Sequence, residues 1–364
     1  MSRDADQRIG KLLDAGERKR RLVHADTRAD AAKLQRLRAK GALVSPHHGL
    51  YVRTSAWAAL TEPERALWKM RALCARHPGW VFCDVSAALA HGLSVPLREV
   101  GTLHVLSSPG SPTRSTGAIV RHATSARGAC WKDGVHVTDL AQSVYDCLRR
   151  LGFRDGLAVA DSGMAAMELD DWETLADRLI ALHHGEPGLR RTLGILRHAD
   201  PRAESGGESI ARAAMLELGF ELPELQVEVP DPFAPGRSYR VDFLWTLPDG
   251  NRVAGELDGR EKYVNPQMTK GRSAVEVLAE ERLRESRLSA AGVRVMRFSF
   301  ADVCRLGFFE SLLERYGIPR PGRPSRLRSP FREEWRPMEL GGWRLRCKRV
   351  WPRSRLAREP EGGR

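Results

Sequence analysis

The strongest constraint on the fold comes from two segments that alternate apolar and polar residues around a Pro-Asp-Gly turn. Alternate residues of 239–247 are apolar, and the alternation resumes in 252–258 after the turn. Because successive side chains of a strand point to opposite faces, this pattern predicts an antiparallel hairpin with one buried face. The other face then carries three acids, Asp242, Glu256 and Asp258.

The hairpin belongs to a longer series of regular segments. The stretch 198–209 contains Pro and paired Gly, which is typical of a linker, so a new domain is expected to begin near residue 201. Apolar periodicity and helix-stop signals then predict helix 208–218, strand 225–229, the hairpin, helix 273–291 and strand 293–299. The order α-β-β-β-α-β places residues 201–317 in an α/β domain.

The three acids predict a metal site. In such a hairpin Asp242 lies directly across from Glu256 or Asp258, at about 5 Å. Like charges in this position destabilise a sheet unless a cation offsets them, and oxygen-only ligands favour Mg²⁺ or Mn²⁺. The last histidine of the chain is His198, so chemistry in this domain runs without imidazole. A divalent ion held by carboxylates is what hydrolysis of a phosphodiester bond requires.

These residues resemble a known family. Glu208, the triplet 241–243 (VDF), the run 255–259 (GELDG) and the segment 280–303 together resemble the restriction-endonuclease-like PD-(D/E)XK superfamily. The likeness is strongest to its branch similar to very-short-patch-repair endonucleases. It implies that Asp242 and Glu256 are metal ligands and that Glu208 is an auxiliary acid.

The chain departs from this superfamily at the third signature position, where lysine is usual and Asp258 stands. Lys262 or Lys270 would then reach back to supply the missing positive charge, or Asp258 is itself a third ligand. The predicted metal ligands are thus Asp242, Glu256 and Asp258. The predicted catalytic residues are Asp242, Glu256, Asp258, Lys262 and Glu208.

Each acid also has an ordinary structural interpretation. Glu208 follows Ser205 by three residues, as in a capping box at the start of a helix. Asp242 fits a solvated strand residue, and Glu256 and Asp258 fit the charges that protect an edge strand. Both interpretations of each residue stay open at this stage.

Positive charge is concentrated at the two ends of the chain. Of the net charge of +13, residues 1–55 carry +7 (13 Lys and Arg against 6 Asp and Glu) and residues 318–364 carry +9 (14 against 5), which leaves −3 for the middle. Basic ends around a near-neutral body favour a polyanionic partner, and DNA is the partner that we expect. Solvated tails that only aid solubility are the alternative.

The first 55 residues predict a small DNA-binding module. A helix over 29–40 ends at Gly41, and an alternating hairpin follows with its turn at 47–49. This combination is typical of a winged helix-turn-helix, whose helix enters the major groove. The candidate DNA contacts are Lys33, Arg36, Arg38, Lys40 and Arg53.

Residues 34–52 and 86–93 also resemble the winged-helix antitoxin module of abortive-infection (AbiEi-type) toxin-antitoxin systems. This likeness implies operator binding, autoregulation and a cognate toxin protein as a partner.

The rest of the chain is less informative. Residues 56–200 predict a mixed α/β domain with helices at 62–76, 84–91 and within 140–197, strands near 102–107 and 118–122, and no catalytic constellation. The tail 318–364 interleaves Trp with Arg, which predicts either a nucleic-acid arm or an extension packed on the body. No apolar run approaches the roughly 20 residues of a membrane span, and the amino terminus lacks the apolar stretch of a signal peptide, so a cytoplasmic protein without membrane contact is expected.

We therefore expect an α/β protein with four parts: a winged helix-turn-helix at 1–55, a mixed middle domain at 56–200, a restriction-endonuclease-like domain at 201–317 and a basic tail at 318–364. The expected function is Mg²⁺-dependent hydrolysis of DNA. The alternative is a catalytically inactive DNA-binding regulator, the antitoxin of a type IV toxin-antitoxin system.

Overall fold

The computed structural model describes residues 2–107, 118–123, 128–258, 274–321, 331–337 and 343–349. It is a mixed α/β protein, as the sequence predicts, and it divides into two compact units. Unit 1 comprises Met1–Leu151 and Asp155–Pro201, and unit 2 comprises Gly152–Arg154 and Arg202–Arg364. The segments predicted at 1–55 and 56–200 thus lie in one unit, and those at 201–317 and 318–364 lie in the other.

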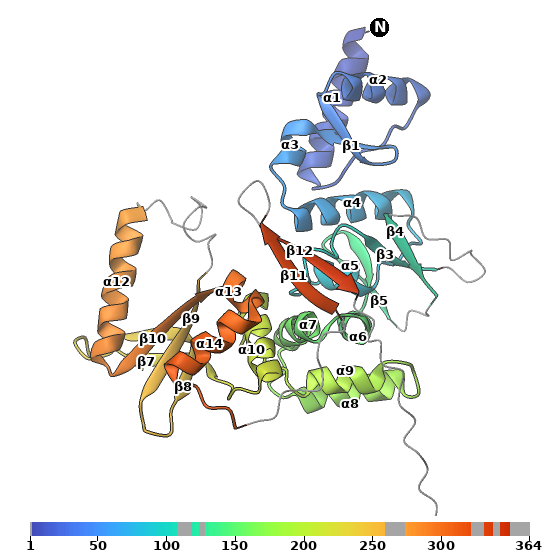
Figure 1. Cartoon of the computed structure of the whole chain (residues 1–364). Coiled ribbons are helices and arrows are strands. Elements are labelled where there is room, and N and C mark those ends of the chain that lie inside the picture. Colours follow the sequence, from blue (N-terminus) through green and yellow to red (C-terminus); the bar gives the residue numbers. More distant parts are fainter. Residues whose placement is uncertain are drawn as a thin grey trace, which may run out of the picture. The chain divides into compact units, whose positions relative to one another are not determined.

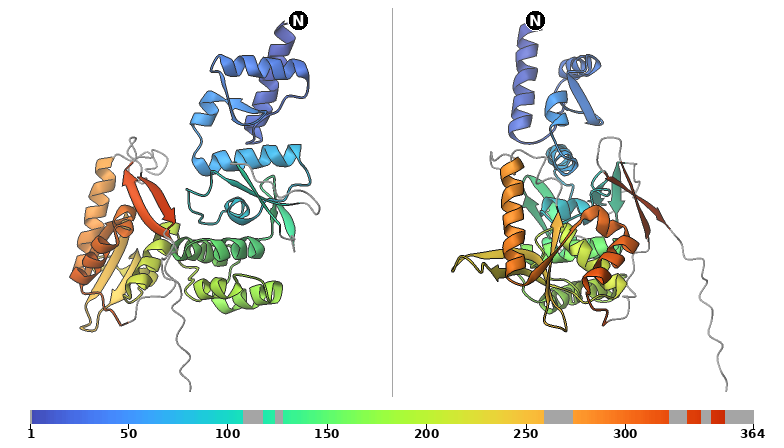
Figure 2. Two further views of the ribbon diagram at one scale, coloured as in Figure 1. Left: turned by 45° about the vertical axis from the view of Figure 1, so that its right-hand side comes forward. Right: turned by 60° about the vertical axis from the view of Figure 1, so that its left-hand side comes forward.

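Unit 1 begins with two helices and a short hairpin, which Figure 2 shows together at the amino-terminal end of the chain. These elements are α1 (Ser2–Arg18), α2 (Arg28–Ala39), β1 (Leu43–His47) and β2 (Leu50–Arg53). The Thr27 side chain accepts a hydrogen bond from the Asp30 backbone and so caps α2, and Gly41 after it has a positive φ of 76°. The predicted helix and hairpin are both confirmed.

The remainder of unit 1 is mainly helical around small sheets (Figure 1). Its helices are α3 (Thr54–Ala58), α4 (Glu62–Arg76), α5 (Asp84–Ala90), α6 (Leu140–Arg150), α7 (Phe153–Ala166, which begins in unit 2), α8 (Trp172–His183) and α9 (Leu189–Leu196). Its strands are β3 (Leu103–Leu106), β4 (Ile119–His122), β5 (Ala129–Lys132) and β6 (Val135–Thr138). Strands β3 and β4 pair in parallel, and β5 and β6 form an antiparallel hairpin.

The β5–β6 hairpin is absent from the sequence prediction, although its turn is a recognisable signal. Asp133 and Gly134 have positive φ values of 46° and 74°. An Asp-Gly pair with this backbone is the preferred two-residue connection between antiparallel strands, because its twist matches that of the strands.

Unit 2 is built on a four-stranded sheet with the order β10-β9-β8-β7. Its strands are β7 (Glu224–Pro230), β8 (Ser238–Thr246), β9 (Arg252–Asp258) and β10 (Val293–Ser299), and its helices are α10 (Gly206–Leu218), α12 (Ala274–Ala290), α13 (Phe300–Cys304) and α14 (Leu306–Tyr316). Neighbouring strands are antiparallel except β9 and β10, which are parallel. The predicted order of helix, three strands, helix and strand is confirmed, and α13 and α14 are additions to it.

Helices cover both faces of this sheet, α12 on one side and α10, α13 and α14 on the other (Figure 1). Val241 packs on the α12 face with Leu288, whereas Phe243 packs on the opposite face with Phe309. The prediction that residues 239–247 bury one face only is therefore wrong. The phase of the alternation changes at Asp242, because each face has its own helical cover to fill.

The carboxy-terminal segment contains β11 (Phe331–Pro337) and β12 (Trp343–Arg349), which pair in antiparallel register. Within the described part of the chain, no helix is both long enough and apolar enough to cross a bilayer.

Candidate functional site

A row of polar residues crosses the sheet of unit 2 at one level. On β7, Gln226 falls between the pairs Leu225↔Phe243 and Val227↔Val241, so it faces Asp242 of β8. On β9, Glu256 follows the pair Phe243↔Gly255 and so also stands opposite Asp242, and on β10 the partner of Glu256 is Arg297. We call Gln226, Asp242, Glu256 and Arg297 the polar row.

The sheet is interrupted on both sides of Asp242. Gln226 has a left-handed backbone with φ of 54°, a conformation that non-glycine residues adopt rarely. Between β8 and β9, regular pairing ends at Phe243↔Gly255, although both strands continue. Beyond that point the Leu257 backbone N–H donates to Asp242 Oδ2 at 2.9 Å, so a carboxylate replaces the usual carbonyl acceptor.

The predicted acids on this hairpin are neutralised by arginines. Glu256 Oε1 accepts a hydrogen bond of 2.7 Å from Arg284 of α12, and Asp258 Oδ2 accepts one of 3.0 Å from Arg297. Of the two acids offered as partners for Asp242, Glu256 is the one whose pKa the Asp242 charge raises. The expectation that crowded carboxylates need a divalent ion leaves out these two cations.

Glu208 joins the polar row from α10, on the other face of the sheet. Its Oε2 accepts hydrogen bonds from the Gln226 side-chain amide at 3.0 Å and the Glu204 backbone at 2.9 Å. Ser205 caps the helix by accepting from the Glu208 backbone, and its hydroxyl donates to Glu208 Oε1. Both interpretations of Glu208 thus hold together, because it stabilises the start of the helix and also contacts the row.

Two acids of this group are hard to ionise. Burial raises the pKa of Glu208 and that of Glu256, and the negative charge of Asp242 raises both further. Hydrogen bonds from Arg284 to Glu256 and from Ser205 to Glu208 act in the opposite direction. The charge of Asp242 therefore acts on both other acids. Positive charge near Asp242 would lower the raised pKa values of Glu208 and Glu256.

The remaining predicted residues fall into two groups. Lys262 and Lys270 lie outside the described residues. In the amino-terminal module, Lys33 pairs with Asp6, and Arg53 pairs with Asp14 at 2.7 Å and Glu17 at 2.8 Å. Arg36 and Arg38 near the carboxyl end of α2 are exposed, as is Lys40, which follows the helix.

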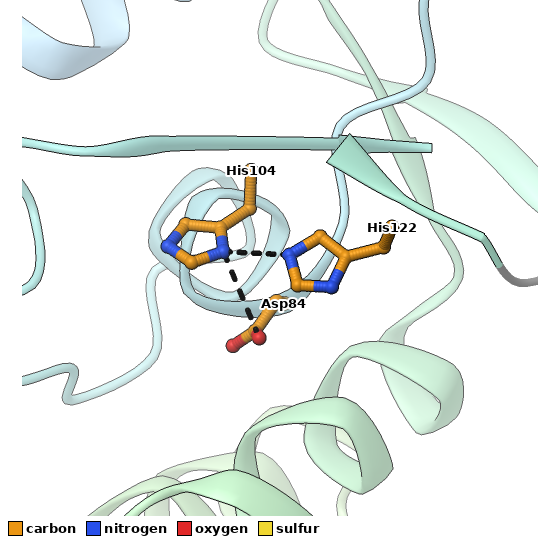
Figure 3. Close-up of side chains that lie close together, drawn as sticks. All are labelled: Asp84, His104 and His122. Carbon is orange, nitrogen blue, oxygen red and sulfur yellow. Dashed lines mark hydrogen bonds and ion pairs between the residues drawn. The ribbon is translucent and has the colours of Figure 1, made fainter. Parts of the chain in front are cut away.

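Unit 1 contains a second cluster, which the sequence prediction missed. Asp84, His104 and His122 each offer one metal-ligating atom, and these atoms all lie within 4.8 Å of one another (Figure 3). Among the described residues, no other three His, Cys, Asp or Glu side chains place potential ligand atoms this close together. The acids of unit 2 are therefore more widely spaced than these three residues.

The cluster is assembled from three elements. His104 lies on β3 opposite Val120, and His122 lies two residues further along β4, so the two imidazoles share one face of the parallel pair. His104 Nδ1 is 2.8 Å from His122 Nε2 and 3.8 Å from Asp84 Oδ2. Asp84 begins α5 with a left-handed φ of 52°.

The Asp84 carboxylate is held by several donors. Arg150 donates to its Oδ2 at 2.7 Å and to its Oδ1 at 3.1 Å, and the Val85 backbone N–H donates to Oδ1 at 2.7 Å. Glu99 accepts a hydrogen bond of 2.9 Å from the same arginine and balances its charge. These contacts fix the carboxylate against the two rings.

Burial sets the charge state of this cluster. It lowers the pKa of His104 to about 4 and also lowers that of His122, although the nearby Asp84 charge opposes both shifts. Burial pushes the pKa of Asp84 upward, but hydrogen bonds and charge from Arg150 outweigh this and hold it below its usual value. Two neutral imidazoles thus face an ionised carboxylate at neutral pH.

Comparisons with known proteins identify two similar sequences. The chain is 30% identical over 227 residues to the uncharacterized proteins MT2308 and Rv2248 from two strains of Mycobacterium tuberculosis, and the match covers 62% of this chain and 77% of each relative. The chain belongs to the family of these two proteins. No protein-family model and no solved structure matches it.

Proposed function

We propose that unit 2 is a restriction-endonuclease-like domain that hydrolyses DNA phosphodiester bonds with Mg²⁺ or Mn²⁺ bound at the polar row. The observation that carries this proposal is the interruption of the sheet at Asp242, where pairing between β8 and β9 ends and Glu256 stands opposite. An interrupted sheet leaves backbone and carboxylate groups outside regular strand pairing, and perturbed acids that share one position are typical of functional sites.

The residues present fit a magnesium site in which the protein supplies only two ligands. Mg²⁺ usually keeps several waters and binds one or two carboxylates together with substrate phosphate. Asp242 and Glu256 supply those two, and Glu208 supports them through Gln226. When bound, the ion polarises the scissile phosphate and lowers the pKa of a water molecule.

We assign to Arg297 the positive charge that a lysine supplies in the superfamily. In the superfamily a lysine stands where this chain has Asp258, and here Asp258 holds the Arg297 guanidinium at 3.0 Å beside Glu256. A guanidinium donates two parallel hydrogen bonds to a phosphate, which suits it to orient the scissile group. In this assignment Asp258 positions the arginine and is no metal ligand.

The proposal is tested by cleavage of supercoiled plasmid and labelled duplex DNA with Mg²⁺, Mn²⁺ or EDTA. We expect cleavage that needs the ion, and Asp242→Asn should reduce its rate to below about 1% while DNA affinity stays within about threefold. The matched control is Asp249→Asn, an exposed acid in the turn between the same two strands. Equal cleavage by Asp242→Asn and the wild type would remove the assignment.

A second candidate is a DNA-binding regulator whose nuclease-like unit is inactive. The observation that favours it is that Arg284 and Arg297 already neutralise Glu256 and Asp258. In this case DNA binding rests on the amino-terminal module, which we propose is a winged helix with α2 as its reading helix. Wild-type protein that binds DNA tightly but takes up no Mg²⁺ or Mn²⁺ in calorimetry would support the regulator.

The DNA-binding role of α2 has its own test. Replacing Arg36, Arg38 and Lys40 together by Ala should weaken DNA binding and flatten the plot of log affinity against log salt by about 2 to 3, since each lost phosphate contact removes about 0.9. The control is Arg178→Ala, at an exposed arginine of α8 outside the amino-terminal module, which should leave the slope unchanged. An unchanged slope in the triple variant would exclude α2 from the interface.

A further inference from the structure

We propose that Asp84, His104 and His122 bind one divalent transition-metal ion, Zn²⁺, in unit 1. The site is separate from the polar row of unit 2 and differs from it in ligand chemistry. It rests on three potential ligand atoms from α5, β3 and β4 that lie within 4.8 Å of one another (Figure 3).

The distances are close to those of a tetrahedral zinc site. With metal–nitrogen and metal–oxygen bonds of about 2.0 to 2.2 Å, two ligand atoms of a tetrahedral site are about 3.3 Å apart. The Nδ1 of His104 lies 2.8 Å from His122 Nε2 and 3.8 Å from Asp84 Oδ2. Both distances differ from the tetrahedral value by about 0.5 Å, which small side-chain rotations can supply.

The orientation of the rings also suits a shared ion. The His104 and His122 rings are stacked, with centroids 5.1 Å apart and an angle of 23° between their planes. Nδ1 of one ring and Nε2 of the other nevertheless face each other across 2.8 Å, and each is an acceptor in the unprotonated form. In the absence of an ion one N–H···N hydrogen bond joins the two nitrogens, and a cation would take its place by using the lone pair of each.

Arg150 serves this site as a positioning residue. It donates to both oxygens of Asp84, as outer partners of metal ligands commonly do to orient a carboxylate. Each carboxylate oxygen has two lone pairs, so Oδ2 can accept from Arg150 and still bind a metal. Glu99 offsets the arginine charge, and the local charge of Asp84, Glu99 and Arg150 is therefore negative before an ion enters.

The ligand set selects the ion. Two imidazoles with one carboxylate suit Zn²⁺ and similar transition metals, whereas Mg²⁺ prefers oxygen ligands alone. Three protein ligands also leave one tetrahedral position for a water molecule, the arrangement found in hydrolytic zinc sites. Zn²⁺ and Mg²⁺ are thus expected at different units of the same chain.

The test uses untagged full-length protein freed of metal with a chelator and titrated with Zn²⁺ by calorimetry in excess Mg²⁺. We expect one Zn²⁺ per chain, and His122→Gln should weaken binding by at least about 100-fold, since even outer partners of ligands contribute 10- to 100-fold. His48→Gln, at an exposed turn histidine, should bind Zn²⁺ as the wild type does. Asp242→Asn should also do so, which separates this site from the proposed nuclease.

Equal Zn²⁺ affinity in His122→Gln and the wild type, or no uptake by the wild type, would overturn the proposal. Circular dichroism establishes that the variant is folded. If it is not, Co²⁺ decides the matter: wild-type protein should develop ligand-field absorption with one equivalent of Co²⁺ and lose it with one equivalent of Zn²⁺. A spectrum identical to that of hexaaquo Co²⁺ would contradict the assignment.

Discussion

The two charged clusters of this chain differ in how closely their side chains are gathered and in what neutralises their acids. In unit 1, Asp84 and His104 are buried and His122 is half-buried, and their potential ligand atoms are already gathered. In unit 2, Asp242 and Glu256 stand at an interruption of a sheet, and arginines from neighbouring elements neutralise Glu256 and Asp258. The ligand atoms of the first cluster lie close together, whereas the acids of the second are more widely spaced.

The difference shows that a group of acids in a sequence is a weak indicator of a metal. Arginine supplies the same compensation from any neighbouring element, and its side chain reaches across several ångströms. Buried imidazoles are different, because their ring nitrogens bind a transition-metal ion directly and the two facing nitrogens here lie 2.8 Å apart. The composition of a cluster is therefore less informative than the geometry of its lone pairs.

The largest contrast is expected when the two aspartate–arginine pairs are broken in turn. The Asp84 side chain is 5% exposed and the Asp258 side chain is 36% exposed, and each pairs with an arginine. Asp84→Ala should lower the free energy of unfolding by about 3 to 5 kcal/mol, because it removes the buried partner of Arg150 and places Ala in a left-handed backbone. Asp258→Ala should lower it by about 1 kcal/mol or less. Urea unfolding followed by tryptophan fluorescence measures both.

A conservative control separates the charge from the backbone at this position. Asp84 has a left-handed backbone, which Asn tolerates and Ala does not. Asp84→Asn should therefore lose less stability than Asp84→Ala. Equal losses at Asp84 and Asp258 would show that burial does not set the strength of these pairs.

Much of unit 2 could be predicted from sequence because its signals are local. Residues 252–258 and 293–299 form strands with the predicted bounds, and the turn between β8 and β9 has Gly250 at a φ of 82°. The change of phase at Asp242 could not be predicted, since it depends on helices that cover both faces. The contact between Arg284 and Glu256 could not be predicted either, because these residues lie 28 apart in the sequence.

The cluster in unit 1 could not be predicted for a related reason. Each strand carries one histidine among apolar residues, at His104 and His122, and such a residue alone is more often a satisfied core histidine. What brings them together is the parallel register of β3 and β4, which no local pattern specifies. The left-handed backbone of Asp84 is likewise a property of the packed structure.

A second, smaller effect is expected at Asp146, a buried acid near Asp84. Burial raises its pKa to about 6, and its Oδ2 has no hydrogen-bond partner among the described residues. A raised pKa stabilises the fold fully below the unfolded value near 3.8, and this contribution is lost as the pH rises through about 6. Asp146→Asn should therefore be more stable than the wild type at pH 7.5, by about 2 kcal/mol.

The pH profile is the decisive measurement for Asp146. Urea unfolding between pH 4 and pH 7.5 should show the gap between variant and wild type widening with pH. Asp170→Asn, at an exposed acid of the same unit, should follow the wild-type profile. Parallel profiles for Asp146→Asn and the wild type would show that this acid ionises normally.

The pair of Glu256 and Arg284 tests whether arginine and an ion compete in unit 2. The Glu256 side chain is 11% exposed, so Arg284→Ala leaves a nearly buried acid without its cation and should cost about 1 to 2 kcal/mol. In a Glu256→Gln background the same change should cost less, which a double-mutant cycle measures. Mg²⁺ should raise the unfolding midpoint of Arg284→Ala more than that of the wild type. An equal or smaller increase would mean that the arginine and the ion do not share Glu256.

The smallest effect is expected from Asp242→Asn, and it bears most directly on the polar row. The raised pKa values of Glu208 and Glu256 favour folding fully below about 4.5, and that contribution is lost as the pH rises through the folded values. Removing the Asp242 charge removes one cause of both shifts, so stability should fall less steeply with pH, by less than about 1 kcal/mol in total. Asn keeps an oxygen to accept from the Leu257 backbone, so the effect is one of charge. Identical pH profiles for Asp242→Asn and the wild type would mean that the charge of Asp242 does not affect the ionisation of Glu208 and Glu256. Acids that do not interact electrostatically are too far apart to bind one ion together.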